Sequence, residues 1–162
     1  KIKEITLNDI SNINEIENII IPTDEINILK DLNINKCNAF AGYPIDDYND
    51  HIFNQKVLKH IKNLTLSSYK EDNFYEKIHL ESSFENYYND LDKWIEKNNI
   101  KIIYLPYVTQ GNWKKIYKKI IKRYDNISFI KFNRKYDINS WIYSKKGYFK
   151  FKQNIPEIIN NI

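Results

Sequence analysis

The chain has 162 residues, of which 42% are hydrophobic and 28% charged, and a formal net charge of +4 at pH 7. This apolar content excludes a chain that is disordered throughout and predicts a domain with its own core. One cysteine, Cys37, excludes an internal disulfide, and no run of about 18 apolar residues is present to form a membrane span. Because residues 1–10 also lack the apolar core of a secretion signal, we expect a reducing, cytoplasmic setting and no membrane partner.

The chain begins at Lys1 and contains no methionine. We therefore expect it to be part of a longer protein, with residues 1–16 as a lead-in from a preceding region. Residues 17–162 are expected to form a single α/β domain, because no repeat or low-complexity linker divides them.

From residue 17 onward, strand patterns alternate with helix patterns. Apolar residues at helical spacing predict helices at 23–32, 50–69, 84–95 and 113–124. Strands alternating with helices form βαβ units. The sequence thus predicts a Rossmann-like, doubly wound, mainly parallel sheet of about five strands with helices on both faces. Short β-branched or alternating runs predict its strands at 17–22, 36–41, 76–80, 100–105 and 127–132.

Local signals predict one helix cap and the structure of the tail. Ser82 or Ser83 is expected to cap the third helix, because serine hydroxyls accept hydrogen bonds from first-turn N–H groups. After the last strand, residues 133–141 are expected to be irregular. Residues 145–159 mix aromatic and basic side chains, and Pro156 is expected to limit any helix there because proline has no N–H to donate.

The C-terminal part of the chain is strongly basic. Residues 1–99 hold 11 Lys or Arg against 18 Asp or Glu, whereas residues 100–162 hold 14 against 3 and also 13 of the 24 aromatic residues. Lysines interleaved with aromatic side chains are typical of surfaces that bind phosphate and stack bases. A DNA-facing basic surface is therefore one interpretation, beside a solvated helix face or docking against the acidic part of the chain. Its candidate residues are Lys145, Lys146, Lys150 and Lys152.

Residues that could carry metal or catalytic chemistry are scattered. The three histidines are far apart in the sequence and Cys37 stands alone, so we predict no metal site and no catalytic residue. Acidic residues after the second strand could hold a cation or a ribose, but such residues more often initiate a turn and cap the following helix. These acidic residues are Asp46, Asp47 and Asp50.

Glycine-rich phosphate loops are missing, since the chain has only three glycines. The turn between the strand at 100–105 and the helix at 113–124 could still receive an anion, because its backbone N–H groups would face the carboxyl edge of the sheet. A plain connecting turn is the alternative. The candidate ligand-binding residues there are Tyr107, Thr109, Gln110, Gly111 and Asn112.

Two stretches resemble a known family. Residues 103–111 read Ile-Tyr-Leu-Pro-Tyr-Val-Thr-Gln-Gly, and residues 137–156 form the closing run. Together they resemble the C-terminal α/β segment of photolyase/cryptochrome-like flavoproteins in which the FAD-binding helical domain comes first. In that group a strand ends in a Thr-Pro-Tyr-x-Pro-Val-Gly-like turn, and the chain ends in a Trp-Pro-x-Ala-x-Lys-Gly-Phe-Phe-x-Phe-Lys-x-x-Ile-Pro-like run. The closing run here keeps the spacing of Gly147, Tyr148, Phe149, Phe151, Lys152, Ile155 and Pro156.

The resemblance implies an accessory, antenna-like α/β domain that is not catalytic by itself. The parent would carry out light-dependent DNA repair or signalling, FAD would bind in a missing helical domain, and this chain would hold no cofactor of its own. Its partners would be that helical domain and DNA. The electron-transfer tryptophans of such proteins lie in the helical part, so we expect core packing for Trp94, Trp113 and Trp141. The alternative is a stand-alone Rossmann-like protein that binds a nucleotide or a nucleic acid.

Overall fold

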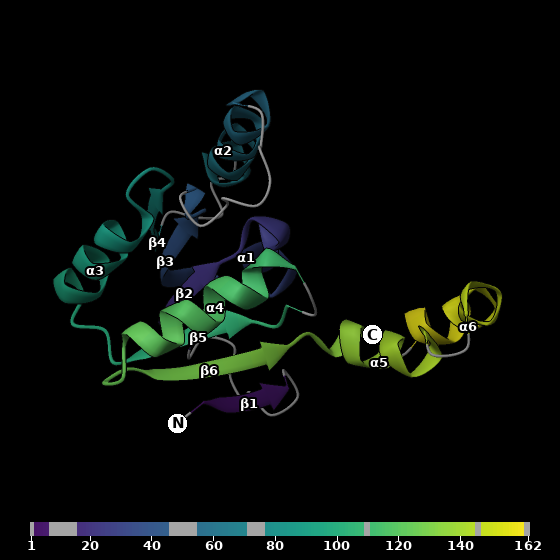
Figure 1. Ribbon diagram of the computed structural model, residues 1–162. Coiled ribbons are helices and arrows are strands. Elements are labelled where there is room, and N and C mark those ends of the chain that lie inside the picture. The colour runs from purple at the N-terminus through teal and green to yellow at the C-terminus, as the bar shows by residue number, and fades with distance from the viewer. Residues whose placement is uncertain are drawn as a thin grey trace.

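The structure is a computed structural model that describes residues 2–6, 16–45, 55–70, 77–108, 111–144 and 147–160. At the centre of this described part is a sheet of six parallel strands in the order β1-β6-β5-β2-β3-β4 (Figure 1). The strands are β1 (Lys3–Thr6), β2 (Asn18–Ile21), β3 (Lys36–Gly42), β4 (Lys77–Ser83), β5 (Ile102–Pro106) and β6 (Ser128–Asn133). The helical segments are η3 (Thr23–Glu25), α1 (Ile28–Asp31), α2 (Gln55–Lys70), α3 (Tyr87–Lys97), α4 (Asn112–Arg123), α5 (Lys135–Ser144) and α6 (Tyr148–Asn160).

The strand order confirms the predicted doubly wound α/β fold. From β2 the chain moves outward through β3 to β4, then returns to the other side of β2 and continues outward through β5 to β6. This order places a topological switch point between β2 and β5, where Ile19 pairs with Tyr104. The sheet has six strands rather than about five. The additional strand, β1, comes from the segment expected to be a lead-in, and it pairs with the outer edge of β6.

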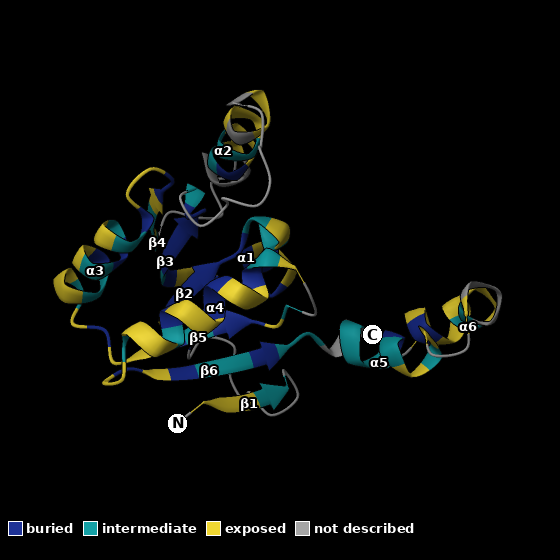
Figure 2. Ribbon diagram, in the orientation of Figure 1, coloured by how far each residue is buried: buried dark blue, intermediate teal, exposed yellow. Residues whose placement is uncertain are grey.

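Successive strand residues point to opposite faces of the sheet, so the central strands bury two separate cores. Ile20 of β2 faces the larger core, which also contains Trp94 of α3 and Trp113 of α4. Ile19 and Ile21 of the same strand face the other core, which is covered by α1. Figure 2 shows this buried centre in dark blue. Helices therefore cover both faces, as predicted.

The predicted cap of the third helix is wrong. α3 begins at Tyr87 and its N-cap residue is Asn86, so neither Ser82 nor Ser83 caps it. Both serines belong to β4, because its pairing with β3 continues to Ser83, three residues beyond the predicted end at residue 80. The Ser83 hydroxyl instead donates a hydrogen bond to Asp90 Oδ2 in α3 at 2.6 Å.

The tail is helical, in contrast to the prediction. α5 spans Lys135–Ser144, where the sequence predicts irregular structure, and α6 spans Tyr148–Asn160 with Pro156 in its interior. α6 continues past Pro156 and buries Ile158, which is 2% exposed. This burial offsets the hydrogen bond that proline does not donate. In Figure 1, α5 and α6 extend away from the carboxyl end of β6 and do not cover the sheet.

Candidate functional site

The carboxyl edge of the sheet at the switch point is the position where doubly wound folds bind ligands. Here β2 leads through Pro22 into η3, and β5 leads through Tyr107 toward α4. The Trp113 Nε1–H of α4 donates a hydrogen bond to Thr23 Oγ1 of η3 at 2.9 Å. Trp113 is 1% exposed and also contacts Tyr43, which follows β3, with ring centroids 5.9 Å apart. The Trp113 indole of α4 therefore contacts the segment after β2 and the segment after β3, and these two strands are neighbours in the sheet.

The predicted anion-binding turn contains Gly111, the N-cap residue of α4. Its φ of +86° lies in the region that favours glycine. Glycine has no side chain that could cap the helix, and the first-turn N–H groups, from Asn112 onward, have no partner within the helix. Such a helix start attracts anions. Tyr107 lies at the same edge of the sheet, 37% exposed, with its ring centroid 5.2 Å from that of Trp141.

The structure describes only some of the residues that the sequence nominated. Of the proposed basic surface, Lys152 is exposed on α6. Lys150 also belongs to α6, but its side chain is not among those that the structure describes.

Two of the three histidines lie in the described part of the chain, and both of them, His60 and His79, are exposed. Within the described ranges no group of three metal-ligating side chains occurs, and no helix is long and apolar enough to cross a membrane. Outside these ranges lie Asp46, Asp47, Asp50, His51, Thr109, Gln110, Lys145 and Lys146.

A charge cluster that the sequence did not suggest lies where β6 leaves the sheet. Arg134 forms ion pairs with Glu25 at 3.0 Å, Asp31 at 3.2 Å and Asp137 at 2.7 Å. Burial lowers the pKa of Arg134, but the hydrogen bond to Asp137 and the nearby carboxylates raise it more strongly. Burial also raises the pKa of Glu25, although the Arg134 charge opposes this shift. No local signal marks the cluster, because Asp31 and Glu25 precede Arg134 by 103 and 109 residues.

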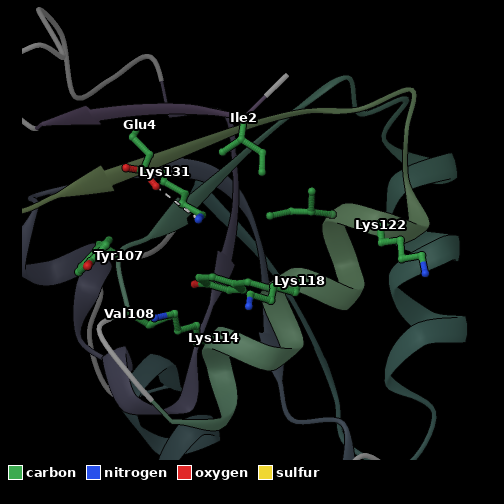
Figure 3. Close-up of a pocket in the computed structure, with 10 residues that line it drawn as sticks. Ile2, Glu4, Tyr107, Val108, Lys114, Lys118, Lys122 and Lys131 are labelled. Atoms are coloured by element: carbon green, nitrogen blue, oxygen red, sulfur yellow. Dashed lines mark ion pairs between the residues drawn. The ribbon is translucent and has the colours of Figure 1, made fainter.

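A second surface, here called the cationic groove, lies between α4 and the strands β6 and β1, of which β1 forms the edge of the sheet (Figure 3). Its volume is about 460 Å³. Lys114, Lys118 and Lys122 line it from α4. Lys131 lines it from β6 and forms an ion pair with Glu4 of β1 at 3.5 Å. The other side chains that line it are apolar or aromatic, namely Ile2, Tyr107, Val108, Tyr117 and Ile121.

Three buried groups of the chain are held in their protonated, neutral forms. The hydroxyls of Tyr87 and Tyr117 have no hydrogen-bond partner among the described residues, and burial raises the pKa of each well above its usual value. Burial also raises the pKa of the Cys37 thiol to about 12. A thiol acts as a nucleophile only when ionised. At neutral pH these three groups therefore supply neither a nucleophile nor a general base.

Comparison of the chain with protein-family models, curated proteins and solved structures found no match. The geometry itself therefore defines the class of protein, which is a Rossmann-like, doubly wound α/β domain with two helices after its last core strand. Its two candidate binding surfaces are the start of α4 at the switch point and the cationic groove.

Proposed function

We propose that this chain is an accessory, antenna-like α/β domain of a photolyase/cryptochrome-like flavoprotein in the cytoplasm. The parent carries out light-dependent DNA repair or signalling, and its FAD is held by a helical domain. Support comes from the two stretches that resemble the family. Residues 103–111 cover most of β5 and the turn after it, and residues 137–156 cover most of α5 and most of α6. The first stretch contains the carboxyl end of β5, and the second begins in the helix that follows the neighbouring strand β6.

The α5–α6 hairpin carries this proposal. Its two helices pack against each other and extend away from the sheet (Figure 1). Ile142, Ile155 and Ile159 are 65%, 38% and 61% exposed. Ile155 and Ile159 are four residues apart, so they lie on the same side of α6, and neighbouring exposed aliphatic side chains are typical of surfaces that contact another domain. We therefore assign the hairpin as the surface that packs against the FAD-binding helical domain.

Contacts at the base of the hairpin hold it in one orientation relative to the sheet. Arg134 precedes α5 and is paired with Glu25 and Asp31 of the η3–α1 segment. Trp141 of α5 contacts Tyr107, the residue that follows β5. A surface that is ordered before binding loses less conformational entropy when its partner docks. These contacts therefore favour a preformed docking surface.

Recovery of the native polypeptide from its source, with an antibody raised against this chain, tests the proposal. The expected product is a polypeptide much larger than this chain, with the absorption bands of a flavin. Recombinant chain mixed with FAD is the control, and we expect it to emerge colourless from gel filtration because the flavin contacts belong to the helical domain. A colourless native species of about 162 residues would exclude the flavoprotein assignment.

We also propose a second candidate function, the binding of a phosphate-bearing ligand such as a nucleotide at the start of α4. Gly111 favours this function, because this N-cap residue has no side chain that could accept hydrogen bonds from the first N–H groups of the helix at the switch point. Titration calorimetry with ADP and with inorganic phosphate tests it. Asn112→Pro removes one N–H at a position where helices accept proline, whereas Asn112→Ala keeps that N–H. We expect weaker binding only for the proline variant, and equal affinities would exclude the site.

A further inference from the structure

The cationic groove lies at a place on the sheet where the described part of the chain has no helix. In a parallel sheet, neighbouring strands that follow each other in the chain are joined by a crossover, usually a helix that covers one face. α4 joins β5 to β6 in this way, but β1 precedes the other strands and pairs with the outer edge of β6. No crossover helix therefore leads from β6 to β1 in the described part of the chain. Among the described residues no helix covers the face beside α4, and the groove lies there (Figure 3).

The wall that α4 contributes to the groove carries uncompensated positive charge. Lys114, Lys118 and Lys122 recur every four residues, so they lie along one side of the helix. All three are exposed, and none forms an ion pair with another described residue. On the opposite wall, Lys131 is paired with Glu4 at 3.5 Å. The row on α4 therefore attracts an anionic occupant.

The rest of the lining is mostly aliphatic. Ile2 is 49% exposed, Val108 and Ile121 are half-buried, and all three line the groove. Among the lining residues Tyr107 offers an exposed ring, whereas Tyr117 is 3% exposed. A single-stranded nucleic acid stacks successive bases on exposed rings, which one tyrosine does not provide. An aliphatic floor beside a row of lysines instead matches an amphipathic helix that carries acidic side chains.

We propose that the cationic groove binds an acidic amphipathic helix of a partner polypeptide. Lys114 and Lys122 are eight positions apart, which is about 12 Å along the helix axis. Carboxylates at positions i, i+4 and i+8 of the partner helix match this spacing, and aliphatic side chains on its adjacent face cover the floor. The bound helix extends the layer formed by α3 and α4. This inference does not depend on the flavoprotein assignment, because it rests on the charge and lining of the groove and not on the resemblance to a family.

A labelled synthetic peptide of about 20 residues, long enough to form a helix, tests the inference by fluorescence anisotropy with the full chain. The peptide carries leucines on one face and glutamates at i, i+4 and i+8 beside them. We expect saturable binding that weakens as salt is added, because salt screens exposed charges. Two control peptides replace either the glutamates by glutamine or the leucines by serine, and both are expected to lose binding. Absence of binding by the acidic peptide would overturn the inference.

Charge-reversal variants locate the site on α4. Lys118→Glu changes the middle of the lysine row, and Lys115→Glu makes the same charge change at an exposed position of α4 outside the groove. We expect about tenfold weaker binding for the first variant, or about 1.4 kcal/mol, and little change for the second. Circular dichroism checks that both fold. Equal losses of peptide affinity in the two variants would overturn the proposal. It would also be overturned if the serine-substituted peptide or a single-stranded oligonucleotide bound as tightly as the acidic peptide.

Discussion

Replacement of Gly42 by alanine tests how closely the carboxyl ends of β3 and β4 must approach. Gly42 pairs with Ser83 and has a φ of +149°, and a Cβ added to it would lie 1.8 Å from the Ser83 carbonyl oxygen. Real Cβ atoms essentially never come within 3.0 Å of such an atom, so the two strands must separate by more than an ångström. The same oxygen accepts a hydrogen bond from the Tyr43 N–H at 3.0 Å. We expect this bond to break.

Three effects add in the Gly42→Ala variant. Backbone strain at a positive φ costs about 1–3 kcal/mol, the hydrogen bond about 1 kcal/mol, and the displacement of packed strands about 1–3 kcal/mol. We expect the free energy of unfolding to fall by about 4 kcal/mol and the melting temperature by about 8–16 °C for a chain of this size. Urea denaturation followed by circular dichroism measures the first quantity, and calorimetry measures the second.

Gly147→Ala is the matched control for this experiment. Gly147 has a φ of +83°, but nothing lies within 4 Å of a Cβ added there. Strain alone then applies, and we expect a loss of about 1 kcal/mol. If Gly42→Ala destabilised the protein no more than Gly147→Ala does, the close approach of β3 and β4 would be refuted.

Three further predictions concern single side chains. Thr23→Val leaves the buried Trp113 Nε1–H without its acceptor, so urea denaturation should show a loss of about 1–3 kcal/mol that Thr23→Ser does not share. The hydrogen bond from Arg123 lowers the pKa of Asp92 in the folded protein. The ionised Asp92 carboxylate therefore stabilises the fold fully at pH values above its pKa in the unfolded chain, and this stabilisation is lost as the pH falls through its lower pKa in the folded protein. The difference in unfolding free energy between wild type and Asp92→Asn should therefore shrink below about pH 4. Cys37, with its pKa raised to about 12, should react with a thiol reagent at pH 8 only after urea is added.

The strands and helices of the sheet were predictable because their signals are local. β2 lies within the predicted strand at 17–22, whose β-branched residues Ile19, Ile20 and Ile21 are all buried. β1 gives no comparable signal, because its four residues are exposed or half-buried and it is held by pairing with β6. α5 was missed because its side chains do not follow an amphipathic stripe. Ser140 is buried on this helix, while Ile142 is 65% exposed.

The candidate sites depend on contacts between distant parts of the chain, which a local pattern does not reveal. Gly111 was recognised as a turn, because a glycine before a helical pattern is a local feature. The row of lysines on α4 was visible as a basic segment, but the opposite wall of the groove comes from Ile2 and Glu4 of the supposed lead-in. The hydrogen bond between Trp113 and Thr23 joins residues 90 positions apart.

Hydrogen exchange of α6 tests the central claim, that the α5–α6 hairpin is the surface on which the flavin domain packs. The comparison is between the isolated chain and the native polypeptide recovered with the antibody, and it follows amides of residues 148–160. Amides covered by a docked domain exchange more slowly because local opening then costs more free energy. We predict exchange at least about tenfold slower in the native polypeptide, or about 1.4 kcal/mol of added protection. Equal rates in α6 in the two samples would contradict the account.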